Sequence, residues 1–328
     1  MLKNLNKLLE KILPLITPCS IVIGVLLGAR LAKFADLSPL IFGFMTFAGS
    51  LNSKLSDLKR VFTRPLALIL TLFILHIAMP LVAFLVGHLF FHDDSYITTG
   101  LILSLVIPAG ITSFIWVSIY NGDIGLTLSV ILIDSLLSPL IVPISMHVFV
   151  GTQVSLDTWS MMKGLCWMIV LPSLAGMLLN QKTGGTITTT LGSKLAPLSK
   201  LGIAIVVAMN GAVVGPYLRH FNMHLIELIV VVVFLSALGY PVGLLTGKLF
   251  RLEKGTIVSM TFNGGMRNNN AGAVMAITYF PSPVALPVIL VMLFQQTLAS
   301  LYGSLLKRHL LARPESKTDD EPSSTLDT

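Results

Sequence analysis

The chain is divided into a succession of apolar runs, each roughly 20 residues long and separated by short polar, charged or Gly/Pro-rich segments. A helical run of this length matches the ~30 Å hydrocarbon core of a bilayer, so the pattern predicts an all-α polytopic membrane protein. Charged residues make up only 11% of the chain, against about 25% in a soluble domain. That deficit argues against an ordinary soluble enzyme.

The boundaries of the apolar runs predict ten transmembrane helices in one domain, residues 1–306. The predicted spans lie near residues 12–32, 37–51, 66–91, 97–120, 124–149, 160–180, 200–218, 224–249, 256–280 and 283–306. The remaining segment, 307–328, is polar and rich in Pro, Ser and Asp. Because it cannot bury enough apolar surface to order itself, we expect a disordered cytoplasmic tail.

The basic residues assign the predicted loops to the two sides of the membrane. Seventeen of the 22 lysines and arginines fall on the side that holds both termini, since the number of spans is even. The other side has four, namely Arg30, Lys33, Lys163 and Arg219. The positive-inside rule therefore predicts a multi-pass protein of the cell membrane with both termini in the cytoplasm. Topology thus explains the net charge of +7, and we expect no nucleic-acid partner.

Ten spans also divide into two groups of five, about 12–150 and 160–306, with opposite orientations because five is odd. Spans four and nine correspond in this division, and both contain helix breakers. These are Pro108-Ala109-Gly110 in span four and the run from Asn263 to Asn270 in span nine. Unwound backbone at mid-membrane is tolerated where it lines a cavity. The sequence therefore predicts an inverted repeat and a secondary transporter with its binding site at the two breaks.

Two charged side chains of opposite sign are predicted at mid-depth. Asp134 follows Asp123 by eleven residues and Arg267 follows Thr256 by eleven, which is roughly 16 Å at 1.5 Å per residue. Each charge costs at least ~2.5–3.5 kcal/mol on insertion scales. Two interpretations remain open: a structural ion pair, or an Arg267 guanidinium that binds a substrate carboxylate while Asp134 tunes it or carries a proton.

Other polar residues complete the candidate site. Thr112 and Ser113 open the half-helix after the break in span four, where they either contact an anion or bond to their own helix. Thr127 shares a helix face with Asp134. His76 in span three is either a proton relay or a packing residue. Span nine adds Asn263, Asn268 and Asn269, whose amides can replace water around an ion, and weaker candidates are Asn210, Gln295 and Gln296.

Motifs of several enzyme classes do not occur in the sequence. There is no Walker loop, no HExxH and no GxSxG, and the two cysteines, Cys19 and Cys166, both lie inside apolar runs. We therefore expect no enzyme activity, no organic cofactor and no obligatory protein partner. The expected partners are a small organic anion, the lipid bilayer and a coupling ion, which is Na⁺ or H⁺.

Three segments of the chain resemble the bile acid:sodium symporter family in its bacterial ten-span form. They are His76–Pro80 in span three, Ile107–Ser113 continuing through Asp123 to Pro139, and Phe262–Asn268 in span nine. The resemblance implies discontinuous helices four and nine that cross, a panel of spans one, two, six and seven, and alternating access between this panel and the core. It also implies cotransport of Na⁺ with a bile acid, a pantoate-like acid or a keto acid.

The resemblance breaks at positions where the family has its sodium ligands. Ser113 and Thr127 keep their hydroxyls, but Phe114 stands in place of an Asn and Ile131 in place of a second hydroxyl. Span nine has Asn263 in place of a Glu, and Arg267 in place of a Gln. A site that has lost a carboxylate and gained a guanidinium is poorly suited to a hard cation.

These departures leave the coupling open between two alternatives. In one, the protein remains sodium-coupled, with Na⁺ bound by backbone carbonyls alone or at Ser113, Thr127 and Asn263. In the other, the Arg267 cation fills the volume of a sodium ion, and coupling is lost or passes to H⁺ through Asp134 or His76. The alternative function is a non-transporting membrane sensor built on the same fold.

Overall fold

A computed structural model describes residues 2–53, 64–151, 154, 157–219 and 222–311. Within these ranges all regular elements are helices, which confirms the all-α class. Six helical segments are long and apolar enough to cross a membrane. They are Pro65–Phe90, Ile124–Val150, Thr158–Lys182, Thr188–Arg219, Met223–Leu249 and Ser282–Leu310.

Four of the ten predicted spans fall on other helices. The first two fall on α1 (Leu2–Leu27) and α3 (Ser38–Ser50), with the short α2 (Ala29–Ala32) and η1 (Ala35–Leu37) between them. Span four is split into α6 (Ser95–Val106) and α7 (Ser113–Ile119), and span nine into α13 (Lys254–Gly265) and α14 (Asn269–Tyr279). The two interruptions expected from the helix breakers are therefore present, whereas the number of spans and the inverted repeat stay predictions.

Two of the long segments contain a widened, π-helical turn just before a proline. In span three, η3 (Ile74–Ala78) joins α4 (Pro65–Phe73) to α5 (Met79–Phe90), which begins next to Pro80. In span six, η4 (Cys166–Val170) joins α9 (Thr158–Leu165) to α10 (Leu171–Lys182). Because proline lacks an N–H and its ring crowds the preceding turn, the helix widens at this point instead of ending. The η3 turn contains His76.

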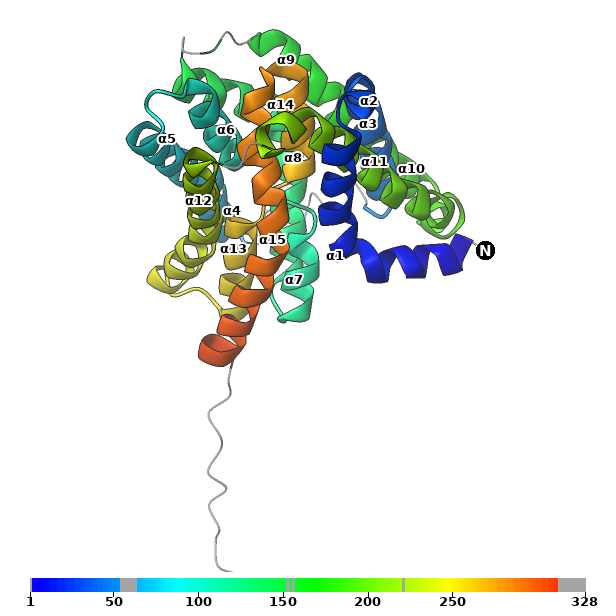
Figure 1. Cartoon of the computed structure of the whole chain (residues 1–328). Helices are drawn as coiled ribbons and strands as arrows, with labels where there is room; N and C mark the ends of the chain where they lie inside the picture. The colour runs from blue at the N-terminus through cyan, green and yellow to red at the C-terminus, as the bar shows by residue number, and fades with distance from the viewer. Residues whose placement is uncertain (1, 54–63, 152–153, 155–156, 220–221, 312–328) are drawn as a thin grey trace, which may run out of the picture.

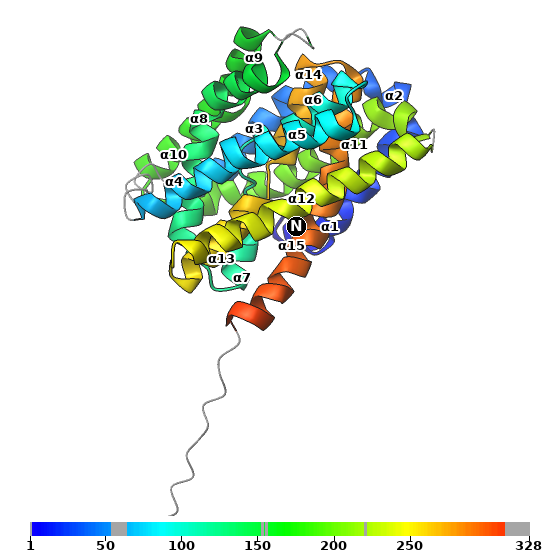
Figure 2. The same cartoon turned by 90° about the vertical axis from the view of Figure 1, so that its left-hand side faces the viewer.

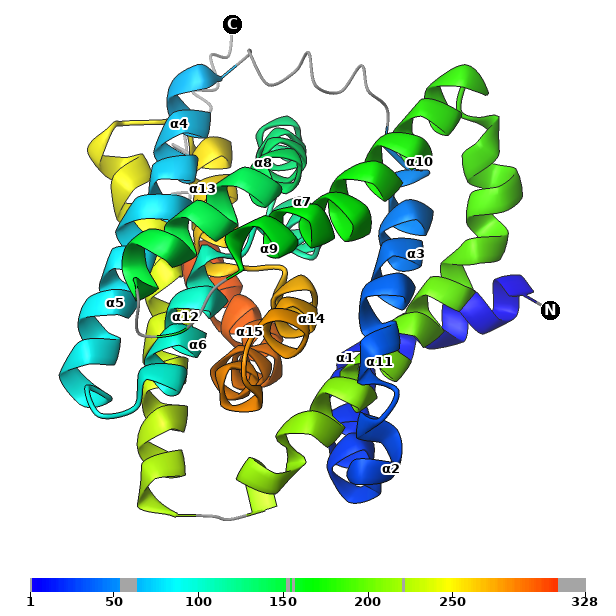
Figure 3. The same cartoon turned by 90° about the horizontal axis from the view of Figure 1, so that it is seen from above.

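The helices form two groups, which Figure 3 separates in the view from above. In one group, α1, α3, α10 and α11 (Ser193–Arg219, preceded by η5, Thr188–Gly192) pack on one another. Glycines allow the close contact of α1 with α11, because a Cβ on Gly24 would lie 2.0 Å from the carbonyl oxygen of Ala208. We call this group the panel; its helices fall on the predicted spans one, two, six and seven, and the alternating access that the resemblance implies for these spans stays a prediction.

The second group contains the broken helices. It consists of α4 to α8 (Ile124–Val150), α12 (Met223–Leu249), α13, α14 and α15 (Ala285–Leu306), which η6 (Ser282–Val284) precedes. In Figures 1 and 2, α12, α13 and α15 lie along one side of this group. The core of the molecule is continuous through both groups, and a smaller apolar cluster surrounds Phe262 and Tyr240.

The last helix extends beyond its predicted end. It continues through η7 (Lys307–Leu311), so the first five residues of the predicted tail are helical. Leu306 and Leu310 pack on the Phe262 cluster, which explains why the helix continues. The rest of the predicted tail, 312–328, lies outside the described residues, as do the positions of Lys54, Lys59 and Arg60 in the charge count.

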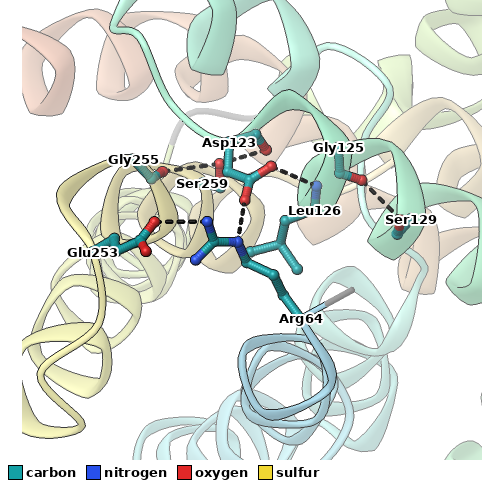
Figure 4. Close-up of polar contacts among 8 residues, drawn as sticks. All are labelled: Arg64, Asp123, Gly125, Leu126, Ser129, Glu253, Gly255 and Ser259. Carbon is teal, nitrogen blue, oxygen red and sulfur yellow. Dashed lines mark hydrogen bonds and ion pairs between the residues drawn. The ribbon is translucent and has the colours of Figure 1, made fainter. Parts of the chain in front are cut away.

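An ion cluster joins the first residues of three core helices (Figure 4). Nε of Arg64 lies 3.0 Å from Oδ2 of Asp123, and Nη2 of Arg64 donates to Oε2 of Glu253 at 2.6 Å. These residues immediately precede α4, α8 and α13, and the hydrogen bond to Glu253 is the main cause that raises the pKa of Arg64. Ser259 adds a hydrogen bond from its hydroxyl to the carbonyl of Asp123 at 2.8 Å. The cluster fixes the three helix ends that lead to the site.

Candidate functional site

The two helix breaks lie against each other in the middle of the core. The backbone N–H of Gly110 donates to the carbonyl of Met266 at 3.0 Å, and that of Asn268 donates to the carbonyl of Pro108 at 2.8 Å. Ala109 and Arg267 thereby form an isolated antiparallel bridge. This pairing satisfies backbone groups that the unwound segments would otherwise leave bare in an apolar interior. The breaks of spans four and nine therefore cross, as expected.

Gly110 is required at this crossing because the two backbones approach closely. A Cβ at this position would lie 2.7 Å from the carbonyl oxygen of Arg267. We expect Gly110→Ala to lower the free energy of unfolding by about 1–3 kcal/mol, as for other overpacked sites. Thermal unfolding of the purified protein measures this. Gly49→Ala is the control, since nothing lies within 4 Å of its Cβ position, and equal melting temperatures for the two variants would contradict the requirement.

Asp134 connects the break in span four to the widened turn in span three. Its Oδ1 lies 2.7 Å from Nε2 of His76, and its Oδ2 accepts a hydrogen bond from the backbone N–H of Ala109 at 2.7 Å. The Asp134 side chain is fully buried and that of His76 is 8% exposed. Oδ1 of Asp134 thus contacts an imidazole that can change its protonation state, and Oδ2 accepts from a backbone N–H of the crossing.

Arg267 lies beside this pair without closing an ion pair to it. Among the described residues, the ion-pair partner of Asp134 is His76, and Arg267 interacts with Asp134 electrostatically at longer range. A structural ion pair between Asp134 and Arg267, one of the two interpretations of the sequence, is therefore not formed. The turn that contains His76 contacts both residues, because His76 pairs with Asp134 and the carbonyl of Leu75 accepts from Arg267.

The Arg267 guanidinium is buried with much of its hydrogen-bonding capacity unused. The residue is 2% exposed, and its Nη2 donates to the carbonyl of Leu75 at a long 3.4 Å. Nε and Nη1 have no hydrogen-bond partner among the described residues. Burying a cation with bare N–H groups is costly unless an anion completes it. The side chain therefore has the donors and the charge for a carboxylate.

The backbone next to Arg267 is held by α15. Gln295 accepts at its Oε1 from the backbone N–H of Arg267 at 3.1 Å and from Nδ2 of Asn269. Oδ1 of Asn269 is buried and has no partner among the described residues. The sequence gives Gln295 only as a weak candidate, although a glutamine inside an apolar run already indicates a buried polar contact.

Ser113, Thr127 and Asn263 form a separate, fully buried hydrogen-bonded cluster. The Ser113 hydroxyl donates to Oδ1 of Asn263 at 2.9 Å, and Nδ2 of Asn263 donates to Oγ1 of Thr127 at 3.1 Å and to the carbonyl of Ser259 at 2.9 Å. The cluster carries no net charge. The Asn263 amide lies among these hydroxyls, whereas the Arg267 guanidinium donates to the carbonyl of Leu75. Ser259 is the member that the sequence did not indicate.

Two predicted residues lie at helix N-termini, and one of them caps its helix. Asn268 caps α14, because its Oδ1 accepts from the backbone N–H of Ala271 at 3.3 Å. Thr112 precedes α7 and makes no side-chain capping bond to it. Within the described residues there is no group of three or more His, Cys, Asp or Glu side chains that could hold a metal ion.

Comparisons with known proteins give a consistent match. A family model described as "Sodium Bile acid symporter family" matches residues 39–221. The uncharacterized protein YbaS of Bacillus subtilis (strain 168) is 48% identical over 296 residues, which cover 90% of this chain and 97% of YbaS. The uncharacterized sodium-dependent transporter YocS of the same organism is 24% identical over 93% of this chain and 92% of its own. A probable chloroplastic sodium/metabolite cotransporter, BASS1 of Oryza sativa subsp. japonica, is 25% identical over 84% of this chain and 67% of its own.

Proposed function

The chain belongs to the sodium bile acid symporter family, and from this premise we propose that it is a secondary transporter of a small organic carboxylate, driven by protons. In this proposal Arg267 binds the carboxylate, and the Asp134–His76 pair carries the proton. Membership in a transporter family and the six apolar helices make the protein a multi-pass membrane transporter. We further propose that α1, α3 and the two broken helices complete ten spans in two inverted halves, with both termini in the cytoplasm.

The single observation that carries the anion assignment is the buried Arg267 guanidinium with unpartnered Nε and Nη1. A planar guanidinium binds a carboxylate through two parallel N–H···O bonds, from Nη2 together with either Nε or Nη1. Nη2 of Arg267 has a second N–H besides the one that donates to the carbonyl of Leu75 at 3.4 Å, so it can pair with Nε or Nη1 in this way. Arg267 is also in the unwound segment between α13 and α14, where a moving helix changes its surroundings. The carboxylate therefore binds where the two broken helices meet, at the centre of the core.

The proton assignment rests on how Asp134 is held. The groups that face its carboxylate are His76 from η3, the backbone N–H of Ala109 from the break, and at longer range the Arg267 guanidinium. Protonation of the carboxylate weakens its acceptance of the Ala109 N–H and its attraction to Arg267. Proton binding thereby loosens the crossing and frees Arg267 for the substrate anion, so that one proton and one carboxylate move together.

The neutral cluster at Asn263 favours protons over sodium. Its oxygens come from two hydroxyls, one amide and one backbone carbonyl, and the amide nitrogen points a donor into the same group. A hard cation binds best to several oxygens that include a carboxylate. No carboxylate belongs to this cluster, so we propose that sodium does not drive transport here.

Uptake by proteoliposomes tests the proposed coupling. We expect accumulation of a labelled carboxylate when the lumen is more alkaline than the outside, and the same rate within about twofold when external Na⁺ is replaced by K⁺ or choline at fixed pH, because a twofold change corresponds to less than ~1 kcal/mol. The control is Asn263→Glu, which restores a carboxylate to the cluster and is expected to introduce a Na⁺ dependence. Na⁺-driven uptake by the wild type, or binding without uptake under either gradient, would contradict the proposal.

A further inference from the structure

An apolar groove lies where the panel helices α1 and α11 meet the core helix α15. It has a volume of about 300 Å³ and is lined by Pro18, Ile21, Val22, Val25, Leu26, Leu218 and Leu293. All seven residues are apolar, and Val22 and Leu26 are 57% and 73% exposed, so the groove opens outward. Figure 1 shows α1 and α15 side by side at this place. In a membrane, this opening faces the acyl chains.

Basic residues gather at one end of the groove. Arg219 is the last residue of α11, and its Nη2 donates to the carbonyls of Val25 and Leu26 near the end of α1. Arg30 lies in α2, which packs on α11, and Lys33 follows α2 directly. The side chains of Arg30 and Lys33 are exposed, and the carboxylate that follows them next in the sequence is that of Asp36. Three cations thus lie within a few residues of the groove lining.

This charge is unusual for its side of the membrane. Arg30, Lys33 and Arg219 are three of the four basic residues that the loop count assigns to the non-cytoplasmic side, where the positive-inside rule disfavours cations. A cation cluster at the interface, next to an apolar groove that runs toward the bilayer centre, matches the two parts of an anionic lipid. The headgroup needs the cations, and the acyl chain needs the groove.

We propose that an anionic phospholipid binds at this place, with its phosphate at Arg219, Arg30 and Lys33 and one acyl chain in the groove. The lipid then contacts α1 and α11 of the panel and α15 of the core at once. Any movement of the panel against the core changes the shape of this groove, so the bound lipid stabilises one arrangement of the two groups. The assignment is independent of the transported substrate, because none of these residues takes part in the crossing.

Competition binding on the purified full-length protein tests the lipid site. A phosphatidylglycerol with a fluorescent acyl chain is bound to protein in phosphatidylcholine nanodiscs and displaced by unlabelled lipids. We expect unlabelled phosphatidylglycerol to displace the probe and phosphatidylcholine to fail. Arg219→Gln and Arg30→Gln are each expected to weaken binding about fivefold, the effect of one interfacial cation. Val22→Trp fills the groove and is expected to abolish binding.

The matched control is Lys163→Gln, which removes the fourth basic residue of this side from α9 and is expected to leave binding unchanged. Equal displacement by the two lipids would overturn the proposal, and so would equal binding by Arg30→Gln, Arg219→Gln and Lys163→Gln. Displacement by soluble glycerol phosphate as strong as by phosphatidylglycerol would also overturn it, since the site would then bind a free phosphate. Arg219→Gln removes hydrogen bonds to α1 and can therefore impair folding. Arg30→Gln keeps every hydrogen bond described above, so the test can be decided on that variant alone.

Discussion

Replacing Arg267 by Gln is expected to abolish carboxylate binding while leaving the ligand-free protein at least as stable as the wild type. Removing one partner of a buried, hydrogen-bonded charge pair costs ~2–5 kcal/mol, which is a loss of at least about thirtyfold in affinity. The ligand-free protein loses a buried cation whose Nε and Nη1 have no partner among the described residues, so the substitution removes a desolvation cost. Thermal unfolding with and without a panel of carboxylates measures both effects in one experiment.

Two variants sharpen this prediction. Arg267→Lys keeps the charge but loses the planar fork, so we expect weakened binding that is not abolished. Arg64→Gln removes an arginine from the exposed ion cluster and is expected to leave carboxylate binding unchanged and to cost less than about 1 kcal/mol. If Arg267 instead serves only as a structural partner of Asp134, Arg267→Gln lowers the stability of the ligand-free protein by about 3–5 kcal/mol, and that outcome excludes the proposed role.

Replacing Asp134 by Asn is expected to separate substrate exchange from proton-driven accumulation. The Asn side chain has nearly the same shape, and its amide oxygen can still accept from the backbone N–H of Ala109. It cannot bind and release a proton. With one proton per substrate, a pH difference of one unit supports up to about tenfold accumulation, and we expect the variant to lose this entirely. Exchange of labelled for unlabelled substrate, with no gradient imposed, is expected to persist.

The measurement compares these two assays in the same proteoliposome preparation. Asp123→Asn serves as the control, because it removes a carboxylate of the ion cluster around Arg64 and leaves the crossing untouched. We expect Asp123→Asn to accumulate substrate as the wild type does. Accumulation driven by a pH gradient in Asp134→Asn would show that the proton binds elsewhere.

The helix breaks were predictable from the sequence because their cause is local. Proline and glycine disfavour a helix interior through their own backbone properties, so Pro108 and Gly110 predict a break in span four. The run from Asn263 to Asn270, rich in glycine and asparagine, predicts the break in span nine in the same way. The parity of the spans made spans four and nine correspond, and the family resemblance implied that they cross. The backbone bridge between Ala109 and Arg267 confirms that the two breaks meet. The class of the fold was equally local, since it depended on the length of the apolar runs.

The side-chain partners were not predictable, because they depend on how distant helices rotate. Asp134 and His76 are 58 residues apart, and His76 contacts Asp134 of α8 from within the widened turn of η3. From the sequence, Arg267 was the candidate partner of Asp134, because the two residues have opposite charges and are predicted at the same depth in the membrane. The depth of a residue along a helix follows from counting residues in the sequence. The direction in which its side chain points depends on how the helices pack, and the sequence does not give this.

The bridge at the crossing consists of main-chain hydrogen bonds, and this has a consequence for how such a protein diverges. Gly110, Met266, Pro108 and Asn268 contribute peptide groups to the bridge, and its hydrogen bonds use no side-chain atom, although Gly110 must lack a Cβ because of the close Arg267 carbonyl. In the mechanism that we propose, exchanges at positions such as Asn263 and Arg267 can therefore change the transported substrate and the coupling ion without rebuilding the scaffold. Under the same proposal, a change of the coupling ion is expected to require the exchange of a few side chains and no change to the bridge.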